Sequence, residues 1–167
     1  NLRDCAIVNL ILKTGLRTVE VERANTDDIV EKGQYTYLYV QGKGRDDKDD
    51  PIKLPESVLT LINEYLEKRN SDDIALFINH GNNIKRKRID TKTISMNIKH
   101  LLRAIGIDDK SYTAHSLRHT CATIALKEGA SFQQVQEVLR HKSINTTTIY
   151  AHNMDREKNN VELIVDQ

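Results

Sequence analysis

The 167-residue sequence carries almost no net charge and contains no long apolar segment. Its formal charge is +1, so charge alone gives no indication of a nucleic-acid partner. No apolar run approaches the ~18 residues of a membrane-spanning helix, and no signal peptide is visible. We therefore expect a cytoplasmic protein without a membrane partner.

Cysteine and proline are also scarce. The two cysteines, Cys5 and Cys121, are far apart and lack metal-ligand spacing, which is typical of a protein in a reducing cytosol. The two prolines, Pro51 and Pro55, flank a short apolar segment and restrict it to the edge of a sheet. The chain begins with Asn1 rather than Met, so we expect a fragment of a longer protein.

The near-neutral total hides an uneven distribution of charge. Residues 85–127 contain ten Lys or Arg and three acids, which gives this segment +7 and the remainder −6. Such a segment predicts one basic face on the folded chain. Taken by itself, a run of charge is more often a solvated surface.

Hydrophobic spacing predicts a mainly α chain with a small antiparallel β-sheet, an α+β fold. Strands are predicted over 35–40 and 52–54, which form a hairpin, and over 75–78. Turns are predicted at 42–44 and 81–83. Helices are predicted over 2–13, from about 16 to 23, and over 58–66, 94–105, 115–128, 131–140 and 145–150.

Two of these helices carry more detailed predictions. The stripe Ile94, Ile98, Leu101 and Ile105 is expected to lie in the core, and the helix to end at the glycine that follows it. In the 131–140 helix, a serine followed three residues later by a glutamine indicates a capping box at its start.

Three short segments concentrate arginine, histidine and tyrosine. In Thr14-Gly15-Leu16-Arg17-Thr18-Val19-Glu20, the glycine allows a tight turn just before an arginine that starts a helix. In 114–120, His115 and Arg118 are three apart and share a helix face. In the third, His141 precedes a predicted helix and Tyr150 ends it, so the two side chains can converge.

These segments, in this order, resemble the tyrosine recombinase (phage integrase) family. A fourth motif, Val40-Gln41-Gly42-Lys43-Gly44, is similar to the hairpin lysine of that family. The resemblance extends from Leu10 to His152, and four ordered motifs are a stronger signal than one short match. It implies the DNA breaking-rejoining catalytic fold and a site-specific recombinase or integrase of a mobile genetic element.

The resemblance implies a chemical role for each matched residue. Tyr150 would attack a DNA phosphorus and form a 3′-phosphotyrosine. Arg17 and Arg118 would hold the non-bridging oxygens with N–H donors that stay charged. His115 is the candidate for proton transfer at the nucleophile, and Lys43 would protonate the departing 5′ oxygen.

The remaining predicted site residues support this centre. His141 would donate a hydrogen bond to the scissile phosphate, and Glu20 would orient the arginine region. Because a covalent link conserves the free energy of the broken bond, neither a metal nor ATP nor another cofactor is expected. The residues predicted to contact DNA are Lys85, Arg86, Lys87, Arg88 and Arg140.

The resemblance also implies partners and a domain organisation. We expect double-stranded DNA and other protomers of the same recombinase, in a tetramer on DNA, with accessory DNA-bending proteins as further candidates. Residues 1–154 would form the catalytic domain, and the tail 155–167 would dock on a neighbouring protomer. The N-terminal DNA-binding domain of the family has no counterpart here. The protein would be bacterial or phage-encoded and act on the chromosome.

Two features depart from the family pattern. Arg140 stands where relatives commonly have glycine, and either contacts phosphate or changes the helix cap. Four acids near Lys43 would repel phosphate unless they point away or are partly offset by neighbouring cations. The acids are Asp46, Asp47, Asp49 and Asp50, and the cations that also compete for the role of Lys43 are Arg45, Lys48 and Lys53.

Three other functions stay open. Residues 131–150 have the character of a helix–turn–helix in a non-enzymatic DNA-binding module. A metal-dependent hydrolase could be built on His115, His119 and His141, although it lacks a carboxylate partner. Strand relaxation by a type IB topoisomerase would use the same order of Arg, His-Arg, His and Tyr.

Overall fold

The computed structural model describes residues 1–41, 46–80 and 87–140 of the chain. It divides into two compact units, Asn1–Cys121 and Ala122–Gln167. The described residues are mostly helical, and their three strands form a small antiparallel sheet. The predicted α+β class is therefore confirmed.

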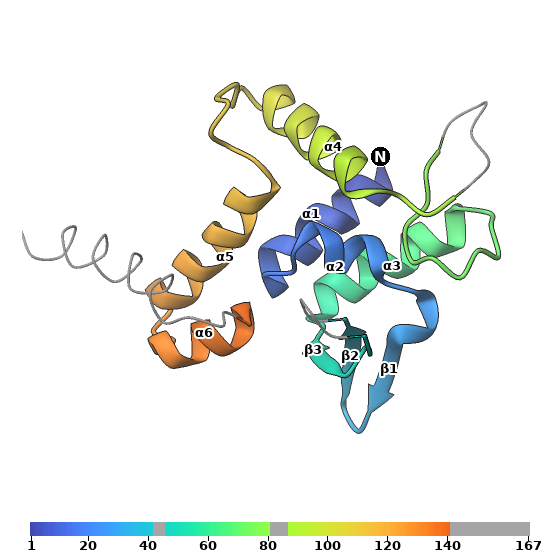
Figure 1. Ribbon diagram of the computed structural model, residues 1–167, viewed down its shortest axis with the longest axis horizontal. Coiled ribbons are helices and arrows are strands. Elements are labelled where there is room, and N and C mark those ends of the chain that lie inside the picture. Colours follow the sequence, from blue (N-terminus) through green and yellow to red (C-terminus); the bar gives the residue numbers. More distant parts are fainter. Residues whose placement is uncertain (42–45, 81–86, 141–167) are drawn as a thin grey trace, which may run out of the picture. The chain divides into compact units, whose positions relative to one another are not determined.

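The helices of the first unit are α1 (Leu2–Thr14), α2 (Thr18–Arg23), α3 (Glu56–Lys68), α4 (Thr91–Ala104) and the first part of α5 (Ala114–Lys127). In this unit α1 packs against both α3 and α4, and α2 packs against α4 (Figure 1). Within the residues that the structure describes, no helix is long and apolar enough to cross a membrane.

The sheet contains one strand more than the sequence predicts. The order is β1 (Ile29–Lys32), β2 (Tyr35–Val40) and β3 (Asp50–Lys53). The predicted pairing of β2 with β3 is confirmed, with Leu38 opposite Ile52, and β3 lies at an edge of the sheet. The additional strand joins β2 through a two-residue turn that begins with Gly33 at φ 63°, a conformation that favours glycine.

The segment 75–78, predicted as a strand, forms only isolated bridges, from Ala75 to Asn25 and from Ile78 to Arg88. Its four side chains are all buried. It lies extended between two other segments, since Leu76 N donates to Ala24 O at 2.9 Å and Ile89 N donates to Phe77 O at 3.0 Å. The prediction of a regular strand was wrong, because isolated backbone hydrogen bonds to two different segments replace the continuous hydrogen-bond ladder of a sheet.

The core of the first unit is built from the apolar faces of α1, α3 and α4, the inner face of β2 and the segment 75–78. Helix α4 corrects one prediction. Ile94 and Ile98 are buried, whereas Leu101 is 38% exposed and Ile105 is 72% exposed. Only the first half of the predicted stripe is core. The helix ends before Gly106, whose φ of 87° suits the predicted C-terminal glycine.

Of the second unit, the structure describes the end of α5 and α6 (Phe132–Leu139). Their buried contact is formed by Ala122, Leu126, Val135 and Leu139. The predicted capping box is confirmed, because the Ser131 hydroxyl accepts from Gln134 N at 3.2 Å and Gln134 Oε1 accepts from Ser131 N at 2.8 Å.

Four predicted elements lie outside the described residues. They are the turns at 42–44 and 81–83, the helix 145–150 and the tail 155–167.

The two ends of the α4 stripe give a matched pair of core substitutions. Ile98→Ala removes a buried side chain, so it should lower the free energy of unfolding by about 2–4 kcal/mol. Ile105→Ala, at the C-cap of the same helix, should change it by less than about 0.5 kcal/mol. Urea denaturation of both variants measures the difference. Equal losses would contradict the assignment of Ile105 to the surface.

Candidate functional site

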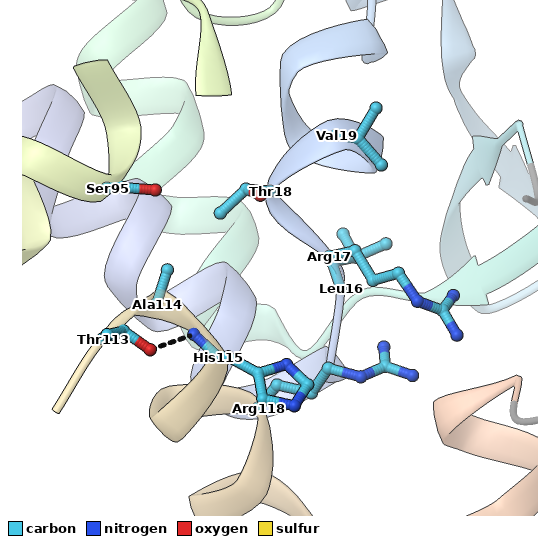
Figure 2. Close-up of a pocket in the computed structure, with 9 residues that line it drawn as sticks. All are labelled: Leu16, Arg17, Thr18, Val19, Ser95, Thr113, Ala114, His115 and Arg118. Atoms are coloured by element: carbon cyan, nitrogen blue, oxygen red, sulfur yellow. Dashed lines mark hydrogen bonds between the residues drawn. The ribbon is translucent and has the colours of Figure 1, made fainter. Parts of the chain in front are cut away.

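A pocket of about 370 Å³ lies in the first unit, between the start of α2, helix α4 and the start of α5 (Figure 2). Two of the predicted segments, 14–20 and 114–120, meet there. Its lining includes Arg17, His115 and Arg118, together with Ser95 and Thr113. The fold therefore brings together three of the residues that the sequence predicts to be catalytic.

The turn that ends α1 sets the geometry of the first segment. Gly15 caps the helix in the left-handed conformation, at φ 64° and ψ 24°, and its N–H donates to Ile11 O at 2.9 Å. Glycine adopts this conformation without the clash that a Cβ would cause. The next residue, Leu16, is buried in the core, so the chain leaves the helix in a fixed direction.

The turn provides the partner for the second arginine. Arg118 is 2% exposed, and its Nη1 donates to the carbonyl oxygen of Gly15. A buried guanidinium is costly unless it is hydrogen-bonded, so this contact joins the start of α5 to the end of α1. In Figure 2 the side chains of Arg17 and Arg118 extend toward the same side of the pocket.

Arg17 is held by the carboxylate of Glu20. Its backbone N–H donates to Glu20 Oε2 at 2.7 Å, and its Nη1 donates to Glu20 Oε1 at 2.9 Å. The Glu20 side chain is 1% exposed and that of Arg17 is 27% exposed. A buried carboxylate thus contacts both the start of α2 and a partly accessible guanidinium.

His115 is placed by a cap that the sequence analysis missed. The Thr113 hydroxyl accepts from His115 N at 3.2 Å, and the Ser116 hydroxyl accepts from Thr113 N at 3.0 Å. This is a reciprocal cap at the start of α5. The threonine and serine three residues apart carried the signal for it.

The histidine has an electropositive environment. Partial burial, followed by the charges of Arg118 and Arg17, lowers the pKa of His115 from its ordinary value of 6.5. Burial, His115 and Arg118 also lower the pKa of His119. The two rings meet edge to face, with centroids 4.3 Å apart. At neutral pH His115 is therefore mostly uncharged and able to accept a proton.

The pocket is suited to an anion. Two guanidinium groups, those of Arg17 and Arg118, line it, and the carboxylate of Glu20 is bound to Arg17. Phosphate oxygens are the acceptors that paired guanidinium groups recognise best. Among the described residues, no group of three or more His, Cys, Asp or Glu side chains could hold a metal ion.

Several predicted site residues lie outside the described residues: Lys43, Lys85, Arg86, His141 and Tyr150. Of the other predicted DNA contacts, Lys87 is exposed. Arg88 is half-buried, and its guanidinium donates to backbone and side-chain oxygens of residues 22–25.

Arg140 ends α6 in the left-handed conformation, at φ 52°. Its Nη1 donates to Val138 O at 2.9 Å. A left-handed residue at a helix end is the position where glycine is favoured, which accounts for the glycine of the family pattern at this position. Arg140 therefore changes the residue type at the C-terminal cap of α6.

Two of the cations that compete with Lys43 are engaged elsewhere. Lys48 forms an ion pair with Asp28, and Lys53 Nζ lies 2.9 Å from the centroid of the Tyr35 ring. Lys48 therefore balances Asp28 rather than the four nearby acids. Of those acids, three are exposed: Asp46, Asp47 and Asp49.

The two histidines of α5 give a direct test of the electrostatics. Both imidazole rings should titrate below pH 6.5 in an NMR experiment. Arg17→Gln should raise the midpoint of His115, because a nearby positive charge disfavours the protonated ring. His119 is the internal control, since Arg17 is not among the causes of its shift. Equal upward shifts of both rings would contradict this geometry.

Known proteins have similar sequences and a similar fold. The chain matches the Phage integrase family over residues 1–157. It is 39% identical over 150 residues to the tyrosine recombinase XerA of Pyrococcus furiosus, covering 89% of this chain and 50% of that protein. It is 37% identical over 155 residues to the tyrosine recombinase XerC of Caldanaerobacter subterraneus subsp. tengcongensis, covering 90% of this chain and 41% of that protein.

Solved structures agree. A crystal structure of XerA recombinase has a TM-score of 0.75 at 30% identity, covering 95% of this chain and 57% of that one. A post-cleavage complex of XerH with its difH substrate has a TM-score of 0.81 at 24% identity, covering 99% and 46%; this second likeness concerns the fold. The chain spans about half the length of the curated relatives it matches. The resemblance inferred from the four motifs is confirmed: the chain belongs to the phage integrase family.

Proposed function

We propose that this chain is the catalytic domain of a site-specific tyrosine recombinase. The full protein would cut and rejoin double-stranded DNA through a 3′-phosphotyrosine, without a metal or ATP. The single observation that carries this proposal is the pocket in which buried Arg118, bound to Gly15 O, lines the same wall as Arg17. The family membership of the chain and its likeness to XerA and XerC support it.

The two arginines would neutralise the phosphate during attack at phosphorus. The non-bridging oxygens gain negative charge in that step, and guanidinium donors already held in place stabilise it without reorganisation. Glu20 holds Arg17 by two contacts, so Arg17 loses little freedom when phosphate binds. Removing one such donor typically slows a reaction by ~10²–10³.

The other residues complete the reaction. Tyr150 attacks phosphorus and displaces the 5′ oxygen of the DNA, so one phosphodiester bond breaks as another forms. His115 accepts the phenol proton, which its lowered pKa permits at neutral pH. Lys43 gives a proton to the departing oxygen, and His141 donates to the phosphate. Attack by a 5′ hydroxyl on the phosphotyrosine reverses these steps and releases the enzyme.

The same proposal gives the partners and the organisation of the protein. Residues 1–154 form the catalytic domain, and 155–167 dock on a neighbouring protomer of a tetramer on DNA. Lys85, Arg86 and Lys87 contact the DNA backbone. The protein acts on the chromosome in the cytoplasm of a bacterium, in line with its similarity to bacterial XerC and XerD proteins.

The proposal predicts a covalent protein–DNA adduct that requires Tyr150. The substrate is a nicked duplex, chosen from a randomised DNA pool by binding to the full-length protein, so that the strand beyond the cleavage point diffuses away. An adduct should form in the presence of EDTA, and Tyr150→Phe should abolish it, because the attacking oxygen is gone. Denaturing gel electrophoresis measures the adduct.

Tyr112→Phe is the matched control, since it removes the hydroxyl of a different tyrosine, one that lies on the surface. It should form the adduct at the wild-type rate. An adduct that persists in Tyr150→Phe, or activity lost with the chelator, would overturn the mechanism. Binding without any adduct would favour the non-enzymatic module. Relaxation of supercoils without strand transfer to a second duplex would favour the topoisomerase-like reaction.

A further inference from the structure

Arg88, which the sequence predicts to contact DNA, is directed into the first unit. Its Nη1 donates to Glu22 O at 2.7 Å and to Ala24 O at 2.9 Å, and its Nη2 donates to Asn25 Oδ1 at 2.5 Å. These oxygens surround the end of α2. One guanidinium therefore satisfies carbonyls that a helix of this length leaves without intrahelical partners, and its charge complements the negative end of the helix.

A second contact joins the end of α2 to the start of α4, and here a side chain of α2 accepts the hydrogen bond. The carboxylate of Glu22, in α2, accepts from the backbone N–H of Thr91 at 2.9 Å. Thr91 is the first residue of α4, where backbone N–H groups have no partner within the helix. We call the contacts of Arg88 and Glu22 the α2 clamp.

Helix α2 depends on such contacts for its position. It has six residues, of which only Glu20 and Val21 are buried. A helix this short has no stability of its own, so its neighbours determine where it lies. Arg17 caps its start, and the α2 clamp holds its end. A shift of the end would therefore move the guanidinium at the start.

We propose that Arg88 is a positioning residue for Arg17. It acts through α2, with no contact to the DNA phosphate, and sets the place of the Arg17 guanidinium in the pocket. The expected effect of Arg88 on the reaction rate rests on the proposed function. Its expected effect on the position of α2 rests on the hydrogen bonds of the α2 clamp. A misplacement of about 1 Å in such a group can cost ~10²-fold in rate.

Arg69 offers a matched control within the same unit. It is buried and likewise donates to backbone carbonyl oxygens, those of Ser71, Asp73, Ala75 and Leu76. Its hydrogen bonds go to the segment after α3, and none of these four bonds goes to the oxygens of residues 22–25 that Arg88 binds. Arg69→Lys should thus lower the melting temperature without changing the cleavage rate of the folded protein.

The experiment compares Arg88→Lys, Arg88→Gln and Arg69→Lys in the full-length protein. The first-order rate of adduct formation at saturating nicked DNA should fall about 10- to 100-fold in Arg88→Gln and less in Arg88→Lys. The affinity for DNA and its dependence on salt should stay unchanged, because a lost phosphate contact would reduce the salt slope by about one. Combined with Arg17→Lys, Arg88→Gln should add little further loss.

Four results would overturn the proposal. A lower affinity with a smaller salt slope would make Arg88 a DNA contact. Adduct formation by Arg88→Gln at the wild-type rate would show that Arg88 does not position Arg17. An equal loss in Arg69→Lys, or full additivity with Arg17→Lys, would indicate general destabilisation. If Arg88→Gln does not fold, Arg88→Lys and Glu22→Gln provide the same rate comparison.

Hydrogen exchange separates this proposal from the proposed function. The amide of Val21 donates to Arg17 O at 3.0 Å and that of Ala24 to Val21 O. Arg88→Lys should speed the exchange of both amides, and Arg69→Lys should not. If the wild type forms no adduct, the proposed function fails while this readout still tests the clamp. Unchanged exchange in Arg88→Lys would refute the clamp itself.

Discussion

The bond between the guanidinium of Arg118 and the carbonyl of Gly15 joins two segments that lie 103 residues apart in the sequence. Arg118 is almost fully buried, and a buried charge without partners costs several kcal/mol. The left-handed turn that ends α1 presents a carbonyl to this guanidinium, and so helps to keep the arginine inside the first unit. One contact makes the end of α1, the start of α2 and the start of α5 mutually dependent.

The two arginines of the pocket are held in different ways. Arg118 is fixed by backbone and by burial, whereas Arg17 is partly exposed and is fixed by a buried carboxylate. A six-residue helix alone would leave the Arg17 guanidinium too mobile for phosphate recognition. The polar contacts of Glu20, Glu22 and Arg88 supply this order at the two ends of α2. Partial burial, followed by the charges of Arg118 and Arg17, lowers the pKa of His115 and leaves the ring mostly uncharged at neutral pH, which links geometry to proton transfer.

The sequence predicted those parts of the fold in which one apolar face decides the structure, such as α1, α3 and β2. The sequence prediction was wrong where the burial of a side chain depends on which elements pack against its helix, as at Ile105, which is exposed. It predicted that Arg17, His115 and Arg118 belong to one site, because their residue types follow from the family motif, and the three side chains line one pocket. It misjudged the environment of Arg88, since the oxygens that bind this side chain are mostly backbone carbonyls. Only the folded chain shows where those carbonyls point.

The central claim is that the pocket neutralises the negative charge of a phosphodiester. The most direct measurement compares wild type and Arg17→Ala on two nicked substrates, one with a normal scissile phosphate and one with a neutral methylphosphonate there. On the normal substrate the variant should be ~10²–10³ slower than wild type. On the neutral substrate that deficit should shrink at least about tenfold, because less charge needs to be balanced. An equal deficit on both substrates would contradict the account.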